Sequence, residues 1–557
     1  MYSSNSAEVL PIYAESSAAE CPVQTGAFDK IFKSFSEFET HLLRAEVYEK
    51  EGNFAAAALS VAVAAGVAAN RHCGLFASPR LERVLISIGR KLSDRHGKQD
   101  NFPRKTNFEN ILHVSTQLAP VGGLTRMISR WISADAKRKN SLLLTQHRGS
   151  VPEHLTSAVR KSGGKIHHLN YRVGGKLEWA LELRRVARDY DAIILHIHCE
   201  DVIPLIAFAE PDRSPPVLFL NHADHLFWLG PSISHLTINL RDAAQDISIG
   251  RRGIEERRNI LLPTIVDPTV RKQSRLDAKR ALKIDPDRVV LLSVARGVKY
   301  RTMNGVSYAD IHAPLLAKFP NATLVVVGVG DPRDWDKARA ETGGRIISLP
   351  EISDPSEYFE AADIYVDSYP FVSSTSMMEA AGYGLPLATL FTGTPDARIF
   401  GINHVGLVGT ALVATSFNEY RDILSQLISD VRFRESAGNS ARLAIEQMHT
   451  PPGWLAFLEA VYERAAQLPP LAPRIMALDS ASEKPYLGEP DCRHQDIVGS
   501  CFDAAEITKG YMGMVPVRHR LALWQEMRRR GAFHSPREAV RHLFPEWLVR
   551  VVKDKYK

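Results

Sequence analysis

Short apolar runs alternate with amphipathic stretches over much of the chain. After residue 105, runs of strand length occupy residues 111–115, 141–145, 192–197, 217–220 and 236–238. Helical patterns, such as the one over residues 177–188, separate several of them. Apolar runs that alternate with amphipathic helices are typical of a parallel β-sheet with helices on both faces.

A second block of the same kind begins after Arg288. Its expected strands are residues 289–294, 323–327, 345–348, 364–367 and 387–389. Between the blocks, residues 259–286 contain three prolines and a charged helical stretch, which indicates a linker. We therefore predict an α/β protein with two Rossmann-like domains. Ligands of open α/β sheets bind beyond the carboxyl ends of the strands, so we expect the site in a cleft between the two domains.

Helical segments flank both blocks. Residues 28–98 show helical spacing, broken at Gly52-Asn53. The apolar run over residues 55–69 is shorter than the roughly 20 residues that span a bilayer, so it predicts one buried helix. This N-terminal helical region is also a candidate surface for a protein partner.

The C-terminal region is basic and amphipathic. Residues 469–490 are rich in proline, serine and acidic residues and predict a linker. Helices are expected near residues 518–530 and 536–552, where large apolar side chains alternate with arginine and lysine. Such helices either pack on the two α/β domains or lie on an anionic membrane. The predicted division is a helical domain over 1–104, Rossmann-like domains over 105–262 and 263–468, and an extension over 469–557.

Composition narrows the class of protein. The 557-residue chain is 45% hydrophobic and 24% charged, with a formal net charge of +6. This charge is too small for a dedicated nucleic-acid binder, so no nucleic acid is expected. The five cysteines are scattered, and residues 1–20 lack the pattern of a secretory signal. We expect a cytoplasmic protein, with the inner face of the membrane as an alternative location.

A loop of hydroxyl residues is the most informative stretch. Ser373, Ser374, Thr375 and Ser376 follow an expected strand and begin a helix that carries Glu379. Hydroxyls and free N–H groups at a helix N-terminus suit a diphosphate, and a carboxylate one turn later suits the two ribose hydroxyls. The structural alternative is that the hydroxyls only cap the helix.

Basic residues follow another expected strand. Arg296, Lys299 and Arg301 lie after residues 289–294, where positive charge stabilises a leaving diphosphate. In the first block, His196 and His198 end one strand, and His222, Asp224 and His225 follow the next. His196 with His198, or Cys492 with His494, could instead form metal pairs, although no second ligand pair accompanies Cys492 and His494.

These segments together resemble the nucleotide-sugar glycosyltransferases of GT-B fold, especially those similar to family 4, over about residues 111–468. The similar segments are the glycine-rich loop at Gly122 and Gly123, residues 262–267 before the second block, the strand end at Gly328, the basic residues Arg296 with Lys299 or Arg301, and the Glu379 helix with Gly384 and Pro386. The hydroxyl loop is similar to that of the protein O-GlcNAc transferases. The family's first acid would fall at Phe371, which departs from the pattern.

The resemblance implies a site and a reaction. His222 is expected to face the anomeric centre, with Asp224 and His225 behind it, either as a base or as a hydrogen-bonding group. The place of Arg241 after an expected strand, and not the resemblance, predicts that this side chain reaches a phosphate or an acidic acceptor. The donor is expected to be a nucleotide sugar, most often a UDP-sugar, without a metal or a separate cofactor. The acceptor, which these residues do not identify, is expected to be a glycan, a lipid-linked glycan or a protein. The alternatives are an NDP-sugar epimerase or hydrolase, or an inactive scaffold that binds a partner.

Overall fold

The computed structural model describes residues 25–95, 101–103, 105–119, 122–330, 332–451, 453–471, 483–499 and 503–555. Its first sheet has seven parallel strands in the order β3-β2-β1-β4-β5-β6-β7. These strands are β1 (Asn110–Ser115), β2 (Lys139–Leu144), β3 (Ile166–His168), β4 (Ala192–His196), β5 (Val217–Asn221), β6 (Leu236–Asn239) and β7 (Asn259–Leu261). The five predicted strands are confirmed to within two residues, and the two short edge strands β3 and β7 were not predicted.

The second sheet has six parallel strands in the order β10-β9-β8-β11-β12-β13. They are β8 (Val289–Val294), β9 (Ala322–Val327), β10 (Ile346–Leu349), β11 (Ile364–Val366), β12 (Leu387–Leu390) and β13 (Leu412–Ala414). Runs of β-branched and leucine side chains make β9 wholly buried and β8 buried up to its last residue, as helices on both faces of a parallel sheet require.

Helices cover both sheets. Those of the first domain are α4 (Gly123–Ala134), α5 (Glu153–Lys161), α6 (Lys176–Ala187), α7 (Ile203–Ala207) and α8 (Asp242–Gly250). Those of the second are α9 (Arg275–Ala281), α10 (Tyr308–Lys318), α11 (Asp336–Glu341), α12 (Ser356–Ala361), α13 (Ser374–Gly382), α14 (Phe417–Ser429) and α15 (Val431–Met448). The 3-10 turns are η1 (Pro211–Arg213), η2 (Glu256–Arg258), η3 (Gly297–Lys299), η4 (Pro332–Trp335) and η5 (Pro395–Phe400).

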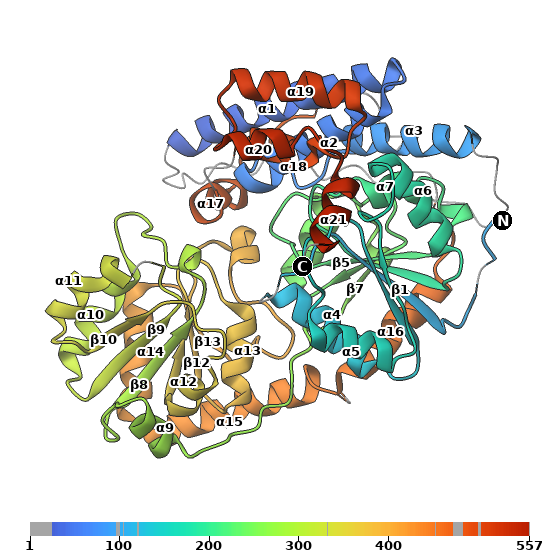
Figure 1. Ribbon diagram of the computed structural model, residues 1–557. Helices are drawn as coiled ribbons and strands as arrows, with labels where there is room; N and C mark the ends of the chain where they lie inside the picture. Colours follow the sequence, from blue (N-terminus) through green and yellow to red (C-terminus); the bar gives the residue numbers. More distant parts are fainter. Residues whose placement is uncertain are drawn as a thin grey trace, which may run out of the picture.

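Helix α16 (Gly453–Gln467) returns from the second domain to the first (Figure 1). Its Trp454, Leu458 and Val461 join the core cluster that contains Trp131 of α4 and Ile111 of β1. The predicted domain boundary at residue 468 follows the order of the chain, whereas in space this last helix belongs to the first domain. Two parallel sheets of these orders with a returning helix form the GT-B fold, so the predicted fold class is confirmed.

The two terminal extensions form one helical cap over the first domain (Figure 1). Its N-terminal helices are α1 (Thr25–Lys50), α2 (Phe54–Arg71) and α3 (Pro79–Arg95). Its C-terminal helices are α17 (Glu489–Ile497), α18 (Ala504–Met512), α19 (Val517–Arg529), α20 (Pro536–Arg541) and α21 (Glu546–Lys555). The His72 imidazole contacts the Asp491 carboxylate at 2.7 Å, with both side chains buried. The sequence predicted two separate extensions, and the structure joins them.

Helix α2 is long and apolar enough to span a membrane, but 83% of its most apolar window is buried inside the protein. It packs in one core with α3, α6 and strands of the first sheet. The prediction of a single buried helix here is confirmed.

Helix α17 ties the cap to the second domain as well. The Arg493 guanidinium donates to the carbonyl oxygen of Thr392 at 2.8 Å, and the Glu489 carboxylate accepts from the backbone N–H of Thr394. On the other side, Asp491 forms an ion pair with Arg251 at 2.7 Å. One polar helix therefore holds both α/β domains and the N-terminal helices together.

Candidate functional site

Lys299 and the hydroxyl loop, two parts of the predicted donor-binding site, meet at the carboxyl edge of the second sheet. Lys299 lies in η3, directly after β8, and the hydroxyl loop with α13 follows β11. Strands β8 and β11 are neighbours in the sheet, so the two loops lie next to one another. This adjacency explains why segments about 75 residues apart in the chain can act on one ligand.

Lys299 is the basic residue that reaches the hydroxyl loop. Its ammonium group donates to the carbonyl oxygen of Val372 at 2.7 Å and lies over the Phe371 ring, 4.9 Å from the centroid. Burial lowers the pKa of Lys299 to about 8, while the nearby Asp367 opposes the shift. A cation held against a loop by one carbonyl and one aromatic face is well placed to receive an anion.

Asp367 fixes the shape of the same loop, and sequence analysis did not single it out. One of its carboxylate oxygens accepts from the backbone N–H groups of Ser368 and Ser373, both at 2.9 Å. The other accepts from the Thr389 hydroxyl at 3.2 Å. Burial raises the pKa of Asp367 to about 6, against the effect of these hydrogen bonds and of Lys299. The sequence signal that could have identified Asp367 is a carboxylate that directly follows a buried apolar strand.

The hydroxyl loop faces the glycine-rich loop of the first domain. Ser373 gives helix α13 no side-chain cap, and its hydroxyl instead bonds the Ser376 hydroxyl at 3.2 Å. A Cβ atom placed on Gly123 would lie 3.8 Å from the Thr375 hydroxyl oxygen. Gly122 is the N-cap of α4, and the two residues before it lie outside the described residues. Two helix N-termini therefore approach one another across the cleft.

Glu379 lies one turn into α13 and points toward the first domain. Its carboxylate pairs with Arg126 at 3.2 Å and with Arg130 at 3.7 Å, both from α4. Burial raises the pKa of Glu379, against the effect of the two arginines. These arginines were not predicted, because nothing in the sequence relates α4 to a residue 253 positions later.

A cavity of about 490 Å³ opens beside this ion pair, between the two domains. Its lining includes Arg126, Arg130, Asp354, Glu379 and Tyr383. The volume lies within the range of small-molecule sites, roughly 300–1,000 Å³, and the lining offers both charges and an aromatic ring. The predicted ribose-binding carboxylate therefore borders a real space in the cleft.

His222 follows β5 on the opposite side of the cleft. Its Nε2 lies 3.0 Å from the carbonyl oxygen of Ile197. Burial lowers the pKa of His222 to about 4, so the ring is neutral near pH 7. Because a carbonyl only accepts, Nε2 carries the proton and Nδ1 keeps a free lone pair. The side chain can therefore accept a proton or a hydrogen bond through Nδ1.

Asp224 and His225 are bound to other side chains. Both carboxylate oxygens of Asp224 accept from the buried Arg241 guanidinium, at 2.6 and 2.7 Å. Burial raises the pKa of Asp224, but Arg241 lowers it further, so that the net pKa is well below its ordinary value. The His225 ring packs against Phe371, with 5.0 Å between centroids. The expectation that Arg241 reaches a phosphate is therefore not met, since its guanidinium is occupied by Asp224 and by the carbonyl of Gly401.

The remaining basic residues of the site differ in position. The Arg296 side chain is 78% exposed and lies 3.6 Å from the exposed Glu351. Arg301 points away from the hydroxyl loop, because its guanidinium donates to the carbonyl oxygen of Gly499 beyond α17.

Gly328 has a φ of +89°, and a Cβ atom there would lie 1.9 Å from the carbonyl oxygen of Ala295. Only glycine therefore lets the β9 end pass so close to the basic loop.

The two metal pairs considered from sequence do not form. His196 turns into the core, where it bonds His113 at 2.9 Å, whereas His198 lies near Glu200. Cys492 packs on α1, and His494 stacks on His72. Over the described ranges, no group of three or more His, Cys, Asp or Glu side chains could hold a metal ion.

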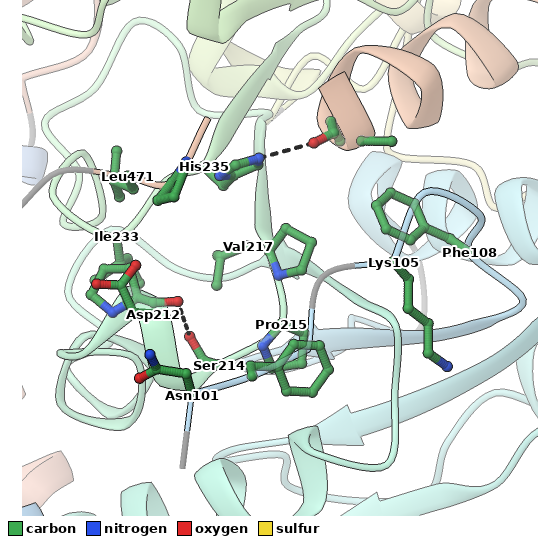
Figure 2. A pocket seen from close by; sticks show the side chains of 16 residues that line it. Asn101, Lys105, Phe108, Asp212, Ser214, Pro215, Val217, Ile233, His235 and Leu471 are labelled. Carbon is green, nitrogen blue, oxygen red and sulfur yellow. Dashed lines mark hydrogen bonds between the residues drawn. The ribbon is translucent and has the colours of Figure 1, made fainter. Parts of the chain in front are cut away.

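A second cavity, of about 220 Å³, lies elsewhere on the first domain (Figure 2). It is lined by a run of prolines and by His235, whose Nε2 bonds the carbonyl oxygen of Ala465 in α16 at 2.9 Å. None of the predicted site residues lines it, so it is separate from the cleft.

The pKa of Lys299 gives a prediction about pH. A diphosphate binds the ammonium form, which predominates below the free-state pKa of about 8 and is lost above it. We expect nucleoside diphosphate affinity to fall by about tenfold for each pH unit above that value. Lys299→Arg keeps its charge and should remove this dependence. Calorimetric titrations between neutral and alkaline pH measure both slopes, and a flat wild-type profile would contradict phosphate contact by Lys299.

Comparison with known proteins gives structural neighbours only. No family model matches the chain. No curated protein matches it in sequence. Among solved structures, Anabaena HepE in complex with UDP and glucose is 16% identical over 64% of this chain and 99% of its own, with a TM-score of 0.47. A mutant O-GlcNAc transferase of Thermobaculum terrenum is 16% identical over 77% and 84%, with a TM-score of 0.47. A glycosyltransferase of Rickettsia africae is 12% identical over 65% and 99%, with a TM-score of 0.49.

Proposed function

We propose that the protein transfers a sugar from a nucleoside diphosphate sugar to an acceptor. The observation that carries the proposal is the meeting of Lys299, the start of α13 and Glu379 at one sheet edge, opposite the glycine-rich loop. A diphosphate requires fixed positive charge and N–H groups. A ribose requires a fixed hydrogen-bond acceptor, and a carboxylate is a strong one.

Each residue then has a role. Lys299 neutralises the leaving diphosphate, and Ser373 to Ser376 hold its oxygens at the start of α13. Glu379 exchanges its contact with Arg126 for the ribose hydroxyls. His222 uses its Nδ1 lone pair either as the base of an inverting reaction or as a partner of the donor sugar in a retaining one. We propose a UDP-sugar as the donor, a glycan, lipid-linked glycan or protein as the acceptor, and no metal or separate cofactor.

Calorimetry with UDP, GDP, ADP, dTDP and their common sugars tests the proposal. We expect one nucleotide to bind, and Glu379→Gln to weaken it by about tenfold or more, since a hydrogen bond to a charged group is worth ~1.5–3 kcal/mol. Glu341→Gln is the matched control, because Glu341 pairs with the exposed Lys337 in the same domain.

Two results would redirect the proposal. Absence of binding to every nucleotide would overturn it and leave a scaffold for a protein partner. Consumption of the donor sugar without any acceptor would indicate an epimerase or hydrolase on the same fold. Analysis of the sugar product then separates an epimerase from a hydrolase.

A further inference from the structure

The net charge of the protein is concentrated in its last helices. Residues 517–557 contain eight arginines and three lysines against four acidic residues, while the whole chain has a net charge of +6. The rest of the chain is therefore close to neutral. Helix α19, which carries much of this charge, lies along the outer edge of the cap, away from both sheets (Figure 1).

The solvent face of α19 combines apolar and cationic side chains. Val517 is 63% exposed, and Leu521 is exposed one turn later. Arg518, Arg528 and Arg529 are exposed on the same side of the helix, because positions three, four, seven and eleven apart share a face. The single acid of this helix, Glu526, is only partly exposed and is paired with Arg530.

Helix α20 extends this surface. The Trp524 indole N–H donates to the carbonyl oxygen of Ala539 at 2.7 Å, which fixes α20 against α19. Val540, beside that contact, is 54% exposed, and Phe544 one turn on is exposed as well. Arg528 lies over the Trp524 ring, 5.3 Å from its centroid. Exposed apolar residues, a half-buried tryptophan and arginines are therefore found together on two helices that contact one another.

We propose that this α19–α20 face docks the protein on an anionic lipid bilayer. The arginines meet the lipid phosphates, and Val517, Leu521, Val540 and Phe544 enter the boundary between headgroups and acyl chains. An isolated basic surface would suit any polyanion, but the exposed apolar residues have a favourable environment only at a bilayer or an apolar partner. Of the bilayer and the apolar partner, we favour the anionic bilayer, because its negative charge is complementary to the arginines. The proposal does not depend on the catalytic role of the cleft.

Co-sedimentation of the full chain with vesicles tests the proposal. We expect the protein to bind vesicles of equal parts phosphatidylglycerol and phosphatidylcholine, and not those of phosphatidylcholine alone. The triple variant Arg518→Glu, Arg528→Glu, Arg529→Glu should bind at least about tenfold more weakly, since each basic residue contributes to attraction by an anionic surface. The double variant Leu521→Gln, Phe544→Gln should bind at low salt only. Its arginines remain, but salt screens their attraction to the lipid phosphates.

A control variant with the same net charge tests whether the loss of vesicle binding is specific to the α19–α20 face. Arg160, Arg280 and Arg432 are exposed on the two α/β domains, and their triple reversal to glutamate should leave vesicle binding unchanged. Equal losses in both triple variants, or no vesicle binding by the folded wild type, would overturn the proposal. Binding to duplex DNA as strong as that to vesicles would also overturn it, because it would indicate a general polyanion surface. Thermal melting of each variant confirms that it folds.

Discussion

Replacement of Lys299 by methionine is expected to lower the rate of sugar transfer by about 10²–10³, the usual effect of removing one preorganised charge or donor at a reacting group. Methionine keeps the length and apolar stem of the side chain and removes only the ammonium group. In the wild type this group is held by the Val372 carbonyl at 2.7 Å and by the Phe371 ring. The ammonium group is therefore in position before the donor arrives, so its removal should lower the rate strongly.

Two variants separate this effect from a general change in charge. Lys337→Met removes an 86% exposed cation from the same domain and should leave the rate unchanged. Arg296→Met should lower the rate by less than about tenfold, because an exposed guanidinium is screened by water. Initial rates measured over a range of donor concentrations give both kcat and KM. An unchanged rate in folded Lys299→Met would remove Lys299 from the site.

The largest loss of stability is expected for Arg241→Met. Arg241 and Asp224 form a buried two-point ion pair, and Arg241 also donates to the Gly401 carbonyl of the second domain at 3.2 Å. Removal of the guanidinium takes both of its hydrogen bonds from the buried Asp224 carboxylate and leaves the His225 ring 3.2 Å away. Breaking a buried ion pair in this way typically costs about 3–5 kcal/mol. The midpoint of urea-induced unfolding, followed by tryptophan fluorescence, measures the change.

The matched comparison is an exposed ion pair. Arg339→Met removes the partner of Asp336, where both side chains are well exposed, and should cost less than about 1 kcal/mol. The double variant Arg241→Met with Asp224→Leu removes both charges and should be more stable than Arg241→Met alone. Equal losses for Arg241→Met and Arg339→Met would show that the buried pair is not a major source of stability.

The central strands of both sheets could be predicted because each is a continuous apolar run. The strands that were missed, β3, β7 and β13, have three residues each, too short for any periodicity. Helix α17 was missed for a different reason. Its inward face carries Asp491, His494 and Gln495, so a search for apolar spacing finds nothing.

The residues of the site also fall into those that could be predicted from the sequence and those that could not. The hydroxyl loop, Lys299 and Glu379 could be predicted because each follows a strand, and neighbouring parallel strands bring such loops together. The partners of Glu379 could not, because Arg126 and Arg130 lie on another domain. The direction of Arg301 depends in turn on a carbonyl group beyond α17, 198 residues later.

The single cap built from both ends of the chain has a consequence for biosynthesis. Helices α1 to α3 leave the ribosome before the two α/β domains, yet His72 meets Asp491 only after 419 further residues have been made. Contacts of such separation form slowly, and the two α/β domains, whose strands pair mainly with near neighbours, can fold earlier. Helices α1 to α3 are thus synthesised before the α/β domains but complete their packing after them. Until then the apolar surface of α2 that α18 will cover stays open to chaperones and to aggregation.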